Sequence, residues 1–317
     1  MYYITAASSI SHQPSFKNED FAENISELQT GSLLIAPNFK EYINPNTIRR
    51  MSEILRTAVT CSLDCLKQAN IEQPDAIVVG TGLGCLVETE KFLENFIANE
   101  EGLISPTAFI QSTHNTIGGQ LSILLGNHNY NMTHTQNALS FEHALQDAAL
   151  CIDEGKGNIL VGGADEHIQL LDEVAGKLGF ENILLTSASS FFILSKSTNE
   201  KAIAKIINVE TIAFAKSFIE TIKTFLFENS IDANSIDLVL YSTLDSQDKL
   251  KLKTVFVESK LLDYLKYSGT YFTNTAFALH YAVDSLKHHA SKAKRILICN
   301  HLHKNHIGLI LVESINV

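Results

Sequence analysis

The sequence lacks the long apolar runs and basic clusters that membrane or nucleic-acid binding requires. No stretch approaches the ~18–20 consecutive apolar residues of a membrane helix. The first ten residues, MYYITAASSI, have neither the basic start nor the long apolar core of a signal peptide. Lys and Arg number 24 against 35 Asp and Glu, and the formal net charge is −11. We therefore predict no membrane span and no nucleic-acid partner.

Cysteine is also scarce, and the number of cysteines is odd. The five cysteines are scattered along the chain, which predicts free thiols in a reducing compartment and hence a cytoplasmic location. Two of them are four residues apart on one predicted helix face, but no further metal ligand lies near them in sequence. Free cysteine behaves as a small apolar residue, so we predict core thiols and no metal site. The cysteines are Cys61, Cys65, Cys85, Cys151 and Cys299.

The one cluster of histidines lies near the end of the chain, at His301, His303 and His306. Alternation along a strand would place His301 and His303 on one side, where two-point metal ligation is conceivable. The alternative, which we favour, is a solvated turn between two closing strands. The cluster therefore predicts a hairpin turn.

The 317 residues are 45% apolar and 19% charged, which is enough apolar material for a substantial core. Predicted strands alternate with predicted helices, as in α/β proteins. Strands are expected at 2–10, 76–79, 129–135, 158–163, 188–195, 202–212, 237–241, 295–300 and 308–313. Helices are expected at 47–69, 86–98, 115–126, 138–154, 213–228, 246–262 and 274–291, with a loop from Ser105-Pro106.

The second part of the chain repeats the strand–helix pattern of the first. No linker rich in Pro or Ser separates the two parts, so we expect them to share one packed unit. The pattern predicts an N-terminal half at residues 1–196 and a C-terminal half at 197–317.

Four motifs follow one another along the first half. A glycine-rich turn, Gly80-Thr81-Gly82-Leu83-Gly84, ends a buried strand, and a Ser-Pro pair follows at Ser105-Pro106. A helix at 115–126 carries Gly118-Gly119, and the strand at 158–163 ends in Gly162-Gly163-Ala164-Asp165-Glu166. In this order and spacing, the motifs resemble the β-ketoacyl synthase family, best over about residues 44–170.

That resemblance implies an α/β thiolase fold, in which two related halves form a five-layer αβαβα arrangement. The chain is shorter than typical ketosynthases. In the family, a cysteine at the start of a buried helix takes the acyl chain as a thioester. The matching position here is Ala138, and no cysteine lies between Cys85 and Cys151 to restore the chemistry.

The two family histidines that drive decarboxylation are also missing at their matching positions. The first falls in Leu240-Tyr241-Ser242-Thr243, with Tyr241 as its equivalent, and Asp248 retains a later acid of that segment. Thr275 stands at the second position. The resemblance therefore implies a non-catalytic, degenerate member with no dissociable cofactor.

A degenerate member of this kind resembles a chain length factor, which pairs with an active ketosynthase and shapes its acyl tunnel. The implied pathway is fatty-acid-like or polyketide assembly, including aryl polyene formation. An acyl carrier protein would visit the complex, and the partner is an active ketosynthase in a heterodimer or a second copy in a homodimer. The alternative is an acyl-binding or decarboxylating homodimer; some decarboxylating relatives carry Gln at the nucleophile position, and here Gln136 lies two residues early.

The same resemblance points to residues for an acyl pocket and for a dimer interface. The family places a residue that limits acyl-chain depth at Leu83, for which ordinary core packing is the alternative. The family interface is built by the helix at 115–126 and the strand at 129–135, for which an intramolecular contact is the alternative. The acyl-pocket candidates are Leu83, Ala108, Gln136, Asn137 and Ala138, and the interface candidates are Asn115, Gly118, Gly119 and Thr133.

Overall fold

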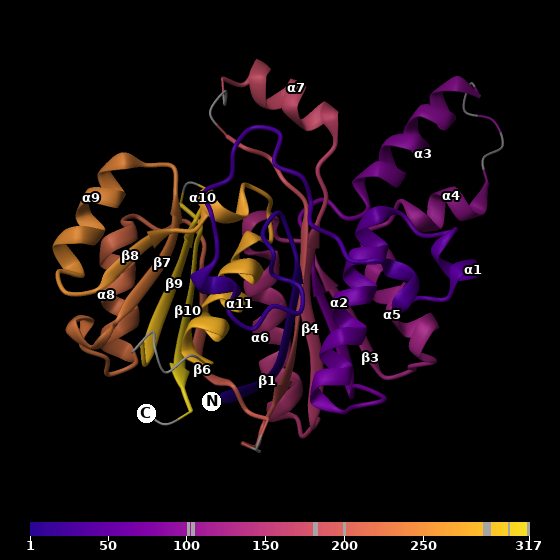
Figure 1. Ribbon diagram of the computed structural model, residues 1–317. Helices are drawn as coiled ribbons and strands as arrows, with labels where there is room; N and C mark the ends of the chain where they lie inside the picture. Colours follow the sequence, from indigo (N-terminus) through magenta and orange to yellow (C-terminus); the bar gives the residue numbers. More distant parts are fainter. Residues whose placement is uncertain are drawn as a thin grey trace.

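The computed structural model describes residues 1–99, 102, 105–179, 183–198, 201–287, 293–303 and 305–315. Ten strands of this described part follow one another in a continuous hydrogen-bonded order, β3-β2-β4-β5-β1-β6-β10-β9-β7-β8 (Figure 1). The strands are β1 Tyr2–Ile10, β2 Ala76–Gly80, β3 Tyr130–His134, β4 Asn158–Asp165, β5 Ala188–Ser195, β6 Ala204–Ile212, β7 Leu238–Thr243, β8 Lys260–Asp263, β9 Arg295–His301 and β10 Ile307–Ser314.

The first five strands and the last five have the same topology. When the five strands of each half are numbered in chain order, their spatial order from the outer edge inward is 3-2-4-5-1 in both halves. The strands β1 and β6 pair where the halves meet. The fifth strand of each half, β5 or β10, is antiparallel to both of its neighbours within that half, and the other pairs within each half are parallel. The pair β1–β6, where the halves meet, is antiparallel. The predicted division into 1–196 and 197–317 stays a prediction, and we place its boundary in the connection between β5 and β6.

Helices cover the outer faces of the two halves of this strand order, which we call the N-terminal sheet (β1–β5) and the C-terminal sheet (β6–β10), and they fill the space between them. The helices α2 and α5 pack on one side of the N-terminal sheet, α6 and α11 lie between the two halves, and α8 and α9 cover the far side of the C-terminal sheet (Figure 1). This is the predicted five-layer arrangement. The helices are α1 Pro45–Ile48, α2 Glu53–Ala69, α3 Leu86–Ala98, α4 Pro106–Gln111, α5 Thr116–Leu125, α6 Ser140–Asp153, α7 Gln169–Lys177, α8 Phe218–Glu228, α9 Ser246–Val255, α10 Leu265–Ser268 and α11 Asn274–Lys287.

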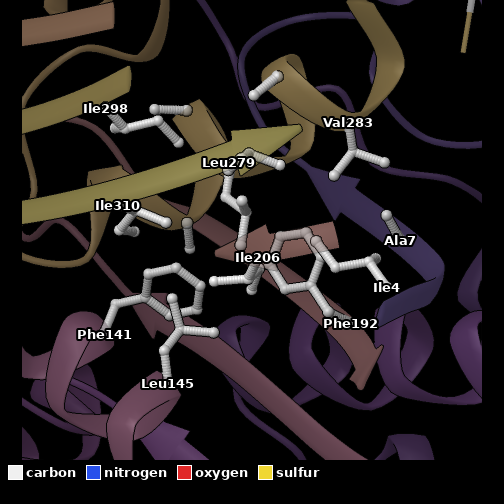
Figure 2. Close-up of a cluster of buried hydrophobic side chains, with 14 of the residues drawn as sticks. Ile4, Ala7, Phe141, Leu145, Phe192, Ile206, Leu279, Val283, Ile298 and Ile310 are labelled. Atoms are coloured by element: carbon white, nitrogen blue, oxygen red, sulfur yellow. The ribbon is translucent and has the colours of Figure 1, made fainter. Parts of the chain in front are cut away.

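Three apolar cores separate these layers. The central core lies between the halves, where Phe141, Phe192 and Leu279 pack with residues of both sheets (Figure 2). An outer core joins α2 and α5 to the N-terminal sheet, and another joins α8 and α9 to the C-terminal sheet. Successive side chains of a strand point to opposite faces, so Phe191 enters the first outer core and Phe192 the central one.

The glycine pair of β4 has a packing reason. A Cβ on Gly162 would lie 2.2 Å from the Phe191 ring, and one on Gly163 would lie 2.9 Å from Thr273, just before α11. Real Cβ atoms essentially never come so close to other atoms. The motif therefore permits a bulky ring on one face of β4 and a close approach of the α11 segment on the other.

Two predicted helices are wrong in part. The helix expected at 47–69 is two helices, because Met51 turns into the outer core and Ser52 is extended, so α2 begins only at Glu53. The helix expected at 246–262 ends at Val255, and Lys260–Asp263 forms β8, parallel to β7. The pairing of β8 with β7 outweighs the helical spacing of apolar residues in 246–262, which is weak.

Other differences concern short segments. The loop expected after Ser105 is the helix α4, with Pro106 at its first position, where proline costs no hydrogen bond. The helix α7 was not predicted, and α8 begins at Phe218 rather than at 213. The expected end of the helix at 288–291 and Lys304 of the histidine turn lie outside the described residues. The remaining predicted strands and helices are confirmed within a few residues of their bounds.

The two ends of the strand order are unlike each other. The edge strand β3 carries Tyr130 and Met132, which are exposed large side chains. At the opposite edge, β8 has four residues, and its Asp263 pairs with Lys249 at 2.8 Å. One edge therefore exposes two large side chains, Tyr130 and Met132, and the other ends in the ion pair of Asp263 and Lys249.

Candidate functional site

Asp165, at the end of β4, holds the glycine-rich turn against the start of α11. Its buried carboxylate accepts hydrogen bonds from Thr81 Oγ1 at 3.0 Å, from Gly82 N at 2.8 Å and from Leu83 N at 3.2 Å. It also accepts from Thr273 N at 2.9 Å and Thr273 Oγ1 at 2.8 Å. Burial raises the pKa of Asp165 while these donors lower it. One carboxylate thus fixes segments of both halves around a common point.

Ala138 lies in a single 3₁₀ turn between β3 and α6, Asn137–Leu139. Asn137 has a left-handed φ of 50°, and Ser140 Oγ accepts from Gln136 N at 2.9 Å and donates to the Asn137 carbonyl at 2.7 Å. The turn therefore directs Ala138 inward, where it is 3% exposed, while Gln136 and Asn137 are exposed.

A buried polar network lies directly behind Ala138. Asn300, from β9, donates through Nδ2 to the Ala138 carbonyl and to Glu142 Oε1, both at 2.7 Å. Ser242 Oγ donates to Asn300 Oδ1 at 3.2 Å and accepts from the Tyr264 hydroxyl at 2.9 Å. All four polar side chains are buried. The network therefore joins α6 of the first half to β7 and β9 of the second.

Thr275 belongs to this network, and Tyr241 does not. The Thr275 hydroxyl is 3.4 Å from that of Tyr264, and Thr275 is 1% exposed. Tyr241 instead packs with the outer core under α8 and α9. Neighbouring strand residues point to opposite faces, so Ser242 is the side chain that β7 turns toward Ala138. The match of Tyr241 and Thr275 to the family histidines stays a prediction.

Glu142 is the one acid of the network. It is fully buried, and burial raises its pKa to about 7, against the hydrogen bond from Asn300. A Cβ on Gly308 of β10 would lie 2.5 Å from Glu142 Oε1, so the carboxyl group fits only against a glycine. Glu142 is not among the site residues predicted from the sequence. Its signal was an acid on the inward face of a helix, four residues after Ala138 and three before Leu145.

Leu83 borders a small apolar cavity of about 80 Å³. Its neighbour Gly82 leaves room for Phe272, whose ring lies 2.3 Å from where a Cβ would be. Drug-sized ligands occupy pockets of roughly 300–1,000 Å³. In the isolated chain the cavity therefore suits only a small group, and a role of Leu83 in an acyl pocket stays a prediction. The cavity is lined by Leu83, Asp165, Glu166, His167, Leu171, Leu185, Thr186, Thr270, Tyr271, Phe272 and Leu302.

The other acyl-pocket candidates lie nearer the surface. Ala108 is half-buried on α4, which packs against α3 through Phe92 and Phe109, with ring centroids 5.8 Å apart. Gln136 and Asn137 are exposed beside β3. Of the five acyl-pocket candidates, Ala138 is buried and Leu83 lines a cavity. Ala108, Gln136 and Asn137 lie at or near the surface of the single chain.

The interface candidates lie together on α5 and β3. A Cβ on Gly118 would lie 2.6 Å from Asn131 Oδ1, and Asn131 Nδ2 donates to the Gly118 carbonyl at 2.8 Å. At Gly119 no atom lies within 4 Å of such a Cβ. Gly118 therefore holds α5 against β3 within the chain, whereas Gly119 faces outward. Asn115 caps the exposed start of α5, and Thr133 is half-buried on β3.

The cysteines are buried in the fold, and the histidines of the C-terminal cluster contact neighbouring side chains. All five cysteines are free and buried, as predicted for core thiols. His301 Nδ1 lies 3.2 Å from Asp248 Oδ2 and its ring stacks on Phe218, while the His303 and His306 rings stack with centroids 4.7 Å apart. Over the described ranges, no three His, Cys, Asp or Glu side chains are placed to hold a metal ion. Within the same ranges, every helix is too short or too polar to cross a membrane.

Comparisons with known proteins agree with this geometry. Residues 36–172 match the family described as "Beta-ketoacyl synthase, N-terminal domain". No curated protein sequence matches the chain. Among solved structures, "the ishigamide ketosynthase/chain length factor" is 15% identical, with a TM-score of 0.81 and 99% of each chain covered.

Two further structures are similar over almost the whole chain. A β-ketoacyl synthase from Burkholderia phymatum is 14% identical, with a TM-score of 0.80 and 99% of each chain covered. The ketosynthase ApeO in complex with its chain length factor ApeC, from Xenorhabdus doucetiae, is 12% identical, with a TM-score of 0.78, covering 99% of this chain and 98% of that one. The whole chain thus has the thiolase-like fold of these proteins, and its residues 36–172 are similar to the N-terminal domain of β-ketoacyl synthases.

Proposed function

We propose that this chain is a non-catalytic ketosynthase-like subunit of the chain-length-factor type, which pairs with an active ketosynthase. The observation that carries the proposal is the residue in the middle of the 3₁₀ turn before α6, Ala138. Covalent acyl transfer needs a nucleophile such as a thiolate. The methyl group of Ala138 offers none, and its carbonyl is engaged by Asn300.

The surroundings of Ala138 support the same proposal. Five polar groups meet there: the amide of Asn300, the hydroxyls of Ser242 and Thr275, the phenol of Tyr264 and the carboxyl group of Glu142. None of them is an imidazole. A condensing enzyme of this family would need imidazoles at this place to polarise the malonyl thioester, so the network favours a structural role for the centre.

The partner is proposed from the β3 edge, by which we mean β3 and the outward face of α5. Ile123, Tyr130 and Met132 are exposed there, and Gly119 leaves space for a close approach. Exposed apolar groups on an edge strand favour association with another chain. The solved ApeO–ApeC complex pairs a ketosynthase with a chain length factor, and we propose a heterodimer of that kind here.

The proposed setting is fatty-acid-like or polyketide assembly, with aryl polyene formation as one possible product class. A solved complex of a type II polyketide acyl carrier protein with its ketosynthase contains a chain that shares this fold at 14% identity. We propose that an acyl carrier protein likewise visits the heterodimer. Free, buried cysteines favour the reducing cytoplasm as its location.

The test is co-expression with a ketosynthase that retains its Cys-His-His set, followed by size-exclusion chromatography and native mass spectrometry. We expect a one-to-one complex that is stable at micromolar concentration. A chain that stays monomeric with and without the synthase would overturn the subunit proposal. A homodimer that excludes the synthase would favour the acyl-binding or decarboxylating alternative.

A further inference from the structure

A cleft of about 810 Å³ opens between the first turn of α2 and the helices α3 and α4. Figure 1 shows α1, α3 and α4 gathered at the same corner of the molecule. Nothing in the proposed function uses this cleft. Its charged lining residues are Arg49, Arg50, Arg56 and Lys91 against Glu53, Glu88, Asp165 and Glu166.

Most of the acidic groups in the cleft are already engaged. Asp165 accepts five hydrogen bonds around the glycine-rich turn. Glu88 pairs with Lys91 at 3.0 Å. Glu166 Oε1 accepts from Val87 N at 2.9 Å, and burial raises the pKa of Glu166 to about 7, so its negative charge is reduced at neutral pH. Of these acids, Glu53 alone is an exposed side chain.

Arg56 and Ser52 stand out because polar atoms of both are buried without a partner. Arg56 Nε and Ser52 Oγ make no hydrogen bond with any residue in the described part of the chain. The two residues are four apart, so they lie on one face of the first turn of α2. Ser52 is the N-cap of α2, yet its side chain caps no backbone N–H. The first turn of α2 thus lines the cleft with two residues that each hold a buried polar atom without a hydrogen-bond partner.

We propose that this cleft binds a small organic oxyanion, a carboxylate or a phosphate monoester, through Arg56 and Ser52. A guanidinium group offers a planar fork of N–H donors that matches two oxygens of a carboxylate or phosphate. Buried donors without an acceptor are unfavourable, and an oxyanion supplies the acceptors. Arg49 and Arg50 are exposed at the same cleft and add positive charge.

The size and lining of the cleft indicate a ligand larger than a bare inorganic ion. Its volume is in the range of small-molecule pockets, and Leu34, Met51, Ile54 and Val87 add apolar contact area. Asp165, Glu166 and His167 also border the small cavity beside Leu83. A ligand held by its anionic group at Arg56 would therefore extend its apolar part toward Leu83.

The test uses the purified full chain and two simple probes, inorganic phosphate and acetate. Each is titrated at constant ionic strength, and the midpoint of thermal unfolding is followed. Binding to the folded state raises this midpoint as the ligand concentration increases. We expect one or both probes to raise it in the wild type, with the apparent affinity at least tenfold weaker in Arg56→Met and intermediate in Arg56→Lys. A response to phosphate alone would indicate a phosphate monoester, and a response to acetate alone a carboxylate.

A matched control removes a cation far from the cleft. Lys253→Met, at an exposed position of α9, should keep the wild-type response. Equilibrium dialysis with radiolabelled phosphate and acetate follows binding directly, at a temperature where every variant is folded. No response of the wild type to either probe, or an equal response of wild type and Arg56→Met, would overturn the proposal.

Discussion

The centre of this chain and its β3 edge differ in what they bury and what they expose. At the centre, Glu142, Asn300, Ser242 and Tyr264 are buried and hydrogen-bonded to one another. At the edge, Ile123 and Met132 are exposed and Gly119 faces open space. The first region closes the chain on itself, and the second leaves apolar surface for a partner. The difference teaches that the apolar surface open to a partner lies at the side of this fold rather than at the family's catalytic position.

The largest expected effect is loss of association in Gly119→Leu. The added side chain meets nothing within the chain but would lie in the proposed interface, where overpacking costs about 1–3 kcal/mol or more. We expect complex formation with the synthase to be lost in sedimentation velocity experiments, together with much of the protein's solubility.

Gly118→Leu serves as the matched control. There the new side chain collides with Asn131 of the same chain, so the free energy of unfolding should fall even without a partner. A Gly119→Leu chain that still forms the complex with unchanged affinity would remove the β3 edge from the proposed interface.

The second effect concerns the centre. The wild-type chain should take no covalent acyl label from radiolabelled acyl carrier protein substrates, read on a denaturing gel, because Ala138 has no thiol. Ala138→Cys should allow slow labelling but no condensation, since Thr275 and Ser242 supply no imidazole. A stoichiometric labelled band on the wild-type chain would contradict the non-catalytic proposal.

The third effect is the pH dependence of stability that Glu142 imposes. The folded state keeps this proton up to a pKa of about 7, whereas the unfolded chain releases it near pH 4.5. Stability should therefore fall as pH rises from about 4.5 to 7, by about 3 kcal/mol from this group, and then stay level. Glu142→Gln cannot ionise and should reduce this slope by the share of Glu142, measured by urea unfolding at several pH values; the similar contribution of Glu166 should remain. The exposed Glu258→Gln should leave the slope as it is, and an equal slope in Glu142→Gln would contradict the assignment.

The smallest effect separates the two faces of β7. Ser242→Ala removes hydrogen bonds to Asn300 and Tyr264 inside the network and should cost about 1–2 kcal/mol of unfolding free energy. Tyr241→Phe, which removes a hydroxyl on the outer side, should change it by less than about 0.5 kcal/mol. Chemical denaturation of both variants measures the difference. Equal losses would mean that both faces of β7 contribute alike.

Much of the fold could be predicted because its signals are local. The apolar run before Gly80 and the paired glycines ending β4 indicate strands whatever their partners are. The centre could not be predicted in the same way. Glu142 and Asn300 are 158 residues apart in sequence and meet only when the halves pack. Nor does the sequence distinguish Tyr241 from Ser242 as the inward residue, because one residue of register reverses the faces of a strand.

The difference between the two edge strands, β3 and β8, also bears on how many chains can join one assembly. If two chains meet at their β3 strands, both apolar edges are consumed, and a β8 strand remains at each outer end. That strand is four residues long and is flanked by the charged pair of Lys249 and Asp263. Short, charged edges discourage further strand addition. In an assembly built through β3, we therefore expect the two outer β8 strands to be poor sites for adding a third chain.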